Sequence, residues 1–209
     1  MGYRGNFYFK GLTFLSQQIN GDILHSLEVI QNCVVATNLN IERAREAFTS
    51  LTSIQINWKI NPDSWSAAEC LSHLVNSNGL YLEKFRKIVN SNSSTKENDF
   101  SYSQSFPGKL ITKGVDPSNQ RKTKTFKPFF PDSSNIDKNI LEKYVETSKE
   151  LISLVEKMKH LDLRKIKLSS PVNLLLRMNL GDPLIFIPKH DVRHLNQAER
   201  VKNHEAFPH

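Results

Sequence analysis

The chain has 209 residues, of which 38% are apolar and 23% are charged. A chain of this length buries its own core in one domain, and its composition excludes collagen-like, purely coiled-coil and wholly disordered proteins. Eight glycines and nine prolines are too few for an all-β protein built on many tight turns. No apolar stretch reaches the roughly 18 residues of a transmembrane helix.

Basic residues outnumber acidic residues by 28 to 21, which gives a net charge of +7. Such an excess raises the question of nucleic-acid or membrane partners. The positive residues are spread along the chain, with short clusters at Arg121–Lys127 and Arg164–Lys167. No zinc-finger spacing and no RNP-type motif accompanies them. We therefore interpret the charge as a solvated basic surface, and we expect no nucleic acid and no membrane as partner.

The first twenty residues contain no continuous apolar stretch, so they do not resemble a secretory signal. Asn6 breaks the myristoylation pattern. Two cysteines without a Cys-x-x-Cys pair predict no disulfide framework, and the cytoplasm is the expected compartment. We assign residues 1–20 to an N-terminal extension, 21–203 to a single helical domain and 204–209 to a tail.

Four segments have the apolar periodicity of long amphipathic helices, and no segment is convincing as a strand. This pattern predicts an all-α bundle. The first helix is predicted over Asp22–Leu51, where apolar residues on spacings of four and three share one stripe. That stripe consists of Ile23, Leu27, Ile30, Val34, Ile41, Ala44 and Phe48, and Thr37 fills its remaining position.

The second helix has the clearest start signal. Ser66 and Glu69 are spaced as a capping box, in which each side chain accepts from the backbone amide of the other residue. The helix is therefore predicted from Ser66 towards Asn90. Trp65, just before the cap, is placed to pack against Cys70.

A long loop is predicted over residues 91–135, which are rich in Ser, Lys and Asn and lack clear periodicity. Loops of this length are uncommon in compact domains. We expect the aromatic residues of 106–108 and 126–131 to hold part of it against the protein. The third helix is predicted over Asp137–His160. Its buried face is expected to consist of Leu141, Tyr144, Val145, Ile152, Val155 and Met158.

Two further helices are predicted near the C-terminus. Ser170-Pro171 can start a short helix that carries Leu174–Leu176. Asp182-Pro183 then supplies an N-cap followed by proline at the first helical position, which opens a fourth long helix to about Lys202. Pro188 lies inside this helix, so we expect a kink or a restart there.

Two of the seven histidines, His190 and His194, are four residues apart on the predicted fourth helix. That spacing stacks two imidazoles on one helix face, so both can reach a single divalent ion. His73 is the best candidate for a third ligand, since it would point into the bundle. The alternatives are a hydrogen-bonded surface pair and a satisfied core histidine. The remaining histidines are assigned to the surface or the tail: His25, His160, His204 and His209.

These residues carry a resemblance to a known family. Residues 65–74 resemble the pattern W-S-x-x-E-x-L-x-H-L that begins the second helix in the DinB-like superfamily, which includes the YfiT-like metal-dependent hydrolases. Residues 190–197 resemble its second signature, H-x-x-x-H-x-x-Q, on the last bundle helix. The stretch 124–131 is similar to a loop in one subset of that superfamily.

The resemblance implies an up-down-down-up four-helix bundle that binds one divalent metal through His73, His190 and His194, often as a homodimer. Its members include thiol S-transferases that act with low-molecular-weight thiols and a maleylpyruvate isomerase that uses mycothiol. Three neutral imidazoles leave a coordination position open, as in catalytic zinc sites. They suit zinc, nickel, copper or iron better than magnesium or calcium, and we expect zinc first, then nickel or iron.

Other residues near these motifs are weaker candidates for a catalytic part. Glu69 is explained by its capping role. Asp191 follows His190 but points about 100° away on an ideal helix, and Gln197 could orient a ligand or substrate. Cys70 could be a soft fourth ligand, although a small buried thiol fits it better.

The first hypothesis for function is a metal-dependent hydrolase or low-molecular-weight-thiol S-transferase that acts on a small molecule. The alternative is a non-catalytic helical bundle whose metal has a structural or regulatory role. A pocket able to orient a substrate would favour the enzyme. A third hypothesis, a basic nucleic-acid binder, has only the net charge in its favour.

Overall fold

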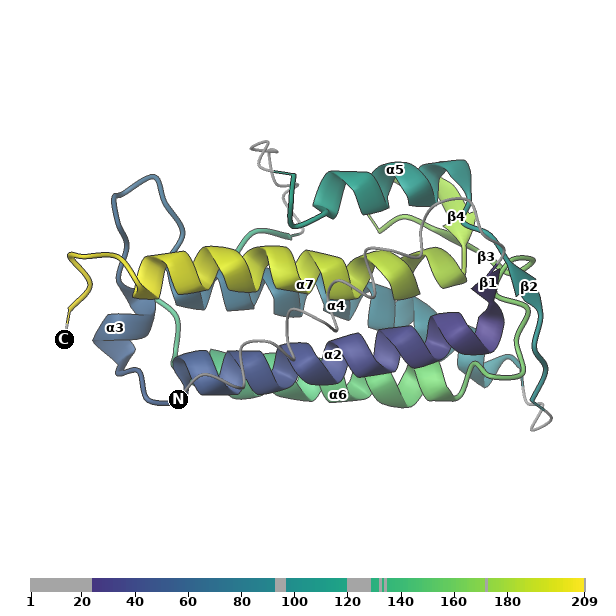
Figure 1. Ribbon diagram of the computed structural model, residues 1–209, viewed down its shortest axis with the longest axis horizontal. Coiled ribbons are helices and arrows are strands. Elements are labelled where there is room, and N and C mark those ends of the chain that lie inside the picture. Colours follow the sequence, from purple (N-terminus) through teal and green to yellow (C-terminus); the bar gives the residue numbers. More distant parts are fainter. Residues whose placement is uncertain are drawn as a thin grey trace.

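The computed structural model describes residues 24–92, 97–119, 129–131, 133, 135–171 and 173–208. Four long helices pack together along its main axis (Figure 1). They are α2 (Ser26–Phe48), α4 (Ala67–Asn90), α6 (Ile140–Glu156) and α7 (Gly181–Lys202). The predicted N-terminal extension, the basic cluster at 121–127 and His209 lie outside the described residues.

The order of the four helices is up-down-down-up. Helices α2 and α7 run in one direction along the bundle, and α4 and α6 run in the other (Figure 1). Both α2 and α4 pack against α6 and α7, so the pairs α2–α4 and α6–α7 lie on the diagonals. The predicted all-α four-helix bundle is confirmed, and it places α4 directly against α7.

Capping fixes where α4 begins. The Ser66 hydroxyl accepts from the Glu69 amide at 3.1 Å, and the Glu69 carboxylate accepts from the Ser66 amide at 2.8 Å. The predicted capping box and helix start are therefore confirmed. A second capping box, formed by Thr52 and Gln55, starts the short helix α3 (Ser53–Asn57).

Two hydrophobic clusters fill the bundle. The first lies near the start of α7 and the second near α3. Fully buried side chains of the first cluster include Ile30, Leu82, Phe85, Val155, Met158 and Met178. Those of the second include Phe48, Leu71, Leu74, Tyr144 and Leu195. On each long helix, a buried polar residue lies along the chain between the residues that belong to the first cluster and those that belong to the second. We call this group the polar layer: Thr37, Asn78, Ser148 and Asp191.

The first helix is shorter than predicted. Leu24–His25 form strand β1, which pairs antiparallel with strand β2 (Ser101–Tyr102), so helix α2 cannot begin before Ser26. The buried stripe is also rotated from the predicted one. Leu27 and Val34 are half-buried. Thr37 is buried as predicted, and the additional buried positions on α2 are Ser26, Val29, Cys33, Ala36 and Asn40.

The segment predicted as a plain loop contains helix α5 (Phe106–Val115) as well as β2. The Ser105 hydroxyl caps α5 by accepting from the Gly108 amide at 3.1 Å, and α5 packs on α7. The expectation that Phe106 holds this segment against the protein was wrong, because its side chain is 74% exposed. The buried contacts of α5 include Gly108 and Thr112 instead.

A hairpin replaces the short helix predicted after Ser170. Strands β3 (Lys167–Ser169) and β4 (Arg177–Asn179) pair antiparallel, with Leu168 opposite Met178. Both of those side chains are buried in the first cluster, and this burial holds the hairpin in place. The leucines on which the helix prediction rested lie in the turn, where Leu175 is 92% exposed.

The third and fourth helices agree with the prediction apart from their ends. Helix α6 is about a turn shorter at each end, and Ile152 on its predicted buried face is only half-buried. The N-cap of α7 is Leu180, so Asp182 lies inside the first turn. The helix continues through Pro188 without a restart. No helix among the described residues has the length and apolar character needed to cross a membrane.

Candidate metal centre

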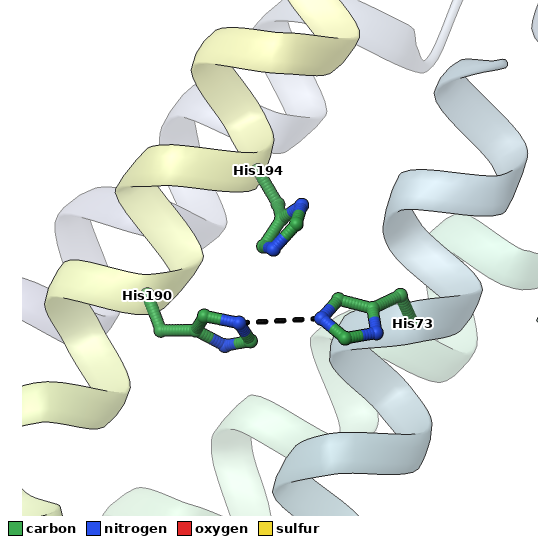
Figure 2. A group of neighbouring side chains, drawn as sticks. All are labelled: His73, His190 and His194. Carbon is green, nitrogen blue, oxygen red and sulfur yellow. Dashed lines mark hydrogen bonds between the residues drawn. The ribbon is translucent and has the colours of Figure 1, made fainter. Parts of the chain in front are cut away.

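Three histidines from two helices meet in the bundle. His73 comes from α4, and His190 and His194 come from α7 (Figure 2). One ring nitrogen from each residue lies within 4.8 Å of the other two. The Nε2 atoms of His73 and His190 are 3.2 Å apart. The imidazole centroids are separated by 5.0 Å (His73–His190), 4.4 Å (His73–His194) and 4.6 Å (His190–His194).

Helix geometry accounts for this convergence. Residues four apart on α7 share one face, so His190 and His194 lie one turn apart on that face, with their rings edge-on. Helix α4 packs antiparallel on α7 (Figure 1), and His73 lies at the level of the pair, with its Nε2 atom 3.2 Å from that of His190. His73 is 3% exposed and His190 is half-buried. The structure therefore brings together the three histidines that the sequence analysis singled out.

Hydrogen bonds to the outer nitrogens set the tautomers of two rings. The Phe129 carbonyl lies 2.6 Å from His73 Nδ1, and the Gln197 side-chain oxygen lies 3.1 Å from His194 Nδ1. Because these oxygens only accept, each Nδ1 carries the proton and each neutral ring keeps a lone pair on Nε2. The Nε2 lone pairs are the ones that face the cluster.

Burial keeps all three imidazoles neutral. Desolvation is the largest cause that lowers the pKa of each ring. For His190 and His194, the neighbouring imidazoles and the Arg193 guanidinium act in the same direction, and the pKa of His190 falls to about 3 as a result of all these causes. A neutral imidazole is the form that binds a metal, so the cluster needs no deprotonation at neutral pH.

The donor set fits a divalent transition metal. Imidazole nitrogens suit zinc, nickel, copper and iron, whereas magnesium and calcium prefer oxygen ligands. Metal-binding histidines almost always donate their other ring N–H to a carbonyl, carboxylate or water, as His73 and His194 do here. Three protein ligands also leave a position open for a small molecule.

Comparison with known proteins identifies the family. The sequence profile of the DinB superfamily matches residues 36–198, which is most of the chain and includes all three histidines. The chain belongs to the DinB superfamily. No curated protein and no solved structure shows detectable similarity to it.

Two aromatic rings border the histidines of this DinB-superfamily protein. The Trp65 ring lies 5.1 Å from the His73 ring and is stacked 5.8 Å from the His194 ring. The Phe129 ring meets His73 edge-on at 6.2 Å. Sequence analysis assigned Trp65 only to a contact with Cys70. The place of tryptophan in the 65–74 pattern, just before the helix that carries His73, was the available signal.

The other predicted site residues lie around the cluster with different contacts. Gln197 is hydrogen-bonded to His194, as described above. Glu69 completes the helix cap and forms an ion pair with Lys59 at 2.8 Å. Cys70 is buried in the second hydrophobic cluster, where burial raises the pKa of its thiol.

Asp191 points away from His190 into the polar layer. Its carboxylate accepts hydrogen bonds from Asn78 at 3.0 Å and from the Tyr144 hydroxyl at 3.1 Å. Burial raises the pKa of Asp191 to about 7, and these two hydrogen bonds act in the opposite direction. The side chain therefore contacts two other helices and does not orient the His190 ring.

His25 and His204, like His160, have partners of their own outside the cluster. His25 is exposed and lies 3.1 Å from the Asp99 carboxylate. His204, in the predicted tail, packs against Trp58, and so does Phe207. Neither histidine belongs to the cluster formed by His73, His190 and His194.

Proposed function

We propose that this protein is a metal-dependent enzyme that activates a small molecule at one divalent ion held by His73, His190 and His194. The observation that carries the proposal is the convergence of three neutral imidazoles. The outer N–H groups of two of them are tied to carbonyl oxygens. A divalent transition metal held in this way supplies a Lewis acid that lowers the pKa of a water or thiol.

The surrounding residues have defined tasks in this proposal. The Phe129 carbonyl and the Gln197 side chain hold the protons on the Nδ1 atoms, which keeps the Nε2 lone pairs turned inward. The rings of Trp65 and Phe129 shield the histidines from bulk water. Electrostatic interactions are stronger in a site from which water is excluded.

Zinc is the proposed metal, with nickel or iron as alternatives, and the reaction is hydrolysis or S-transfer from a low-molecular-weight thiol. Family membership supports these two reaction classes. We further propose that the protein acts in the cytoplasm as a homodimer, which light scattering of the purified protein tests. The competing proposal is a bundle whose metal has a structural or regulatory role. The burial of His73 favours it, because a structural site is closed.

Metal analysis is the first experiment. Protein purified without a nickel column should contain about one equivalent of zinc, nickel or iron, measured by inductively coupled plasma mass spectrometry. His73→Ala and His194→Ala should each lose that metal. His25→Ala is the matched control, because it removes an exposed histidine outside the cluster. Equal metal content in all four proteins would refute the site.

Activity then separates the enzyme from the competing proposal. Glutathione and 1-chloro-2,4-dinitrobenzene test S-transfer: the thiol loses its proton, sulfur bonds to the aromatic carbon, and chloride leaves. p-Nitrophenyl acetate tests hydrolysis. The metal-loaded protein should turn over one of these substrates, and the chelated protein should not. If the purified protein holds one metal ion but the metal-loaded and chelated forms react at equal rates, the structural or regulatory role is favoured.

A further inference from the structure

One buried carboxylate joins three helices at the level of the histidines. Asp191 on α7 is 0% exposed and accepts from Asn78 on α4 and from Tyr144 on α6. Both donors are buried as well. An isolated buried carboxylate is costly, and hydrogen-bond donors offset only part of that cost. The bundle therefore retains a costly group in the middle of its core.

The three linked residues lie close to the proposed ligands along the chain. Asp191 directly follows His190, and Asn78 comes five residues after His73. On ideal helices these offsets turn the side chains by about 100° and about 140°. The ligands therefore occupy one face of the α4–α7 contact, while Asp191 and Asn78 meet on another face of the same contact.

Packing alone does not require a carboxylate at this position. The neighbouring layers of the bundle are filled by apolar side chains. Replacing buried charged groups with apolar residues often leaves stability unchanged or increases it. A hydrogen-bonded carboxylate adds a preferred register, because sliding or rotating α7 would leave buried groups without partners. Such a register is useful where atoms on two helices must meet at one point.

We propose that Asp191 is a positioning residue. Through Asn78 and Tyr144 it fixes α7 against α4 and α6, and in this way it sets the convergence of His73 with His190 and His194. This inference rests on the proposed metal site. A metal site tolerates errors of only a few tenths of an ångström in its ligand positions, which is less than helix packing tolerates.

Titration of the metal-free protein with Co(II), after removal of the chelator, tests the proposal. The visible absorption of bound Co(II) reports the geometry and number of its ligands. Asp191→Ala should weaken cobalt binding by about tenfold or more and change the absorption bands. Asp191→Asn should restore both. The amide oxygen can accept from Asn78, and the amide N–H can donate to the Tyr144 hydroxyl.

Asp182→Ala is the matched control. Asp182 is also 0% exposed on α7, but it lies eight residues before His190 and bonds to Tyr102, Ser105 and Asn179. Its removal should lower the melting temperature without changing cobalt affinity or absorption. If Asp191→Ala does not fold, Tyr144→Phe removes one of the two hydrogen bonds and should weaken cobalt binding about fivefold.

The outcomes separate the two proposals. Wild-type protein that binds no cobalt would refute the metal site, and the positioning role would fall with it. Wild-type protein that binds cobalt, with equal affinity in Asp191→Ala and Tyr144→Phe, would refute only the positioning role. That role would also be refuted if Asp182→Ala weakened cobalt binding as much as Asp191→Ala, because the loss would then reflect general instability.

Discussion

Helix α7 carries two buried polar clusters that are built from opposite kinds of groups. Near its start, the Asp182 carboxylate accepts from the Tyr102 hydroxyl at 2.6 Å, from the hydroxyl and amide of Ser105, and from the Asn179 amide. Near its middle, His190 and His194 meet His73 with their Nε2 atoms turned towards one another. In the first cluster one carboxylate accepts from several donors. In the second cluster, imidazole nitrogens that can act as acceptors face one another.

The difference indicates which cluster needs a ligand. The Asp182 cluster satisfies itself, and it joins α7 to β2, to the start of α5 and to β4. The Nδ1 protons of His73 and His194 are directed outward, so a neutral cluster has at most one inward proton, that of His190, for three inward nitrogens. Burial opposes adding protons because it lowers the pKa of all three rings. A metal cation satisfies such a set without protonation. The first cluster is therefore part of the framework, and the second is the candidate site.

The largest effect is expected from removing the Asp182 carboxylate, which accepts all the hydrogen bonds described for the first cluster. Asp182→Ala leaves the buried Tyr102 hydroxyl and Asn179 backbone amide, and the half-buried donors of Ser105, without their acceptor. Removing one partner from a buried charged network costs about 3–5 kcal/mol. Urea unfolding should show a loss of this size in the free energy of unfolding. A loss below about 1 kcal/mol would mean that water replaces the carboxylate, and the cluster would not be essential to the framework.

Removing a histidine should have the complementary effect. Structural zinc binding is worth about 10–16 kcal/mol over four ligands, so one ligand contributes about 3 kcal/mol. His194→Ala should therefore weaken zinc binding by about a hundredfold or more, measured by competition with a chromophoric chelator. Circular dichroism should show a folded helical protein with chelator present, because the two hydrophobic clusters remain. Loss of the helical signal in both the variant and the chelated wild type would make the metal structural.

A smaller effect is expected from the group that orients His194. Gln197→Ala removes the acceptor for Nδ1–H while leaving the ligand in place. Loss of such an outer partner lowers metal affinity by about 10–100-fold. Gln197→Glu keeps an oxygen at this position and should keep affinity near the wild-type value. Equal losses in both variants would show that the side chain acts through packing and not through its oxygen.

Local signals made the histidine pair and the start of α4 predictable. The capping box at Ser66 and Glu69 depends on residues three apart, and the edge-on contact of His190 with His194 depends on residues four apart. The direction of Asp191 also followed from helix geometry, since a rotation of about 100° turns it away from His190. Each of these features is determined within one or two turns of a helix.

The missed features depend on contacts between distant parts of the chain. Strands β1 to β4 have two or three residues each, too few for a periodic pattern, and β1 pairs with a segment about 77 residues away. Residues 170–176 suggested a short helix, yet Leu174 and Leu175 lie exposed in a hairpin turn. The partner of His73 is the backbone carbonyl of Phe129, and a backbone group leaves no mark on residue type.

The smallest effect is the change in unfolding free energy per pH unit as the histidines of the metal-free cluster titrate. Burial lowers the pKa of His190 from 6.5 to about 3, and it lowers those of His73 and His194 as well. Below about pH 6.5 the unfolded chain therefore binds protons at these positions that the folded protein does not, so stability falls as the pH falls. Asp191 acts with the opposite sign, because its folded pKa of about 7 exceeds the ordinary value of 3.8. Three histidines against one carboxyl group leave a net loss of stability in acid.

His190→Gln isolates one of these contributions. It removes one titrating group, so the slope of unfolding free energy against pH should decrease by up to about 1.4 kcal/mol per pH unit. Urea unfolding in chelator at pH values of about 6.5, 5.5 and 4.5, for wild type and variant, measures both slopes across the range in which the unfolded histidine titrates. Parallel slopes would mean that His190 takes up its proton as readily in the folded protein as in the unfolded chain. Protons could then satisfy the lone pairs of the cluster, and the contrast with Asp182 would no longer point to a metal.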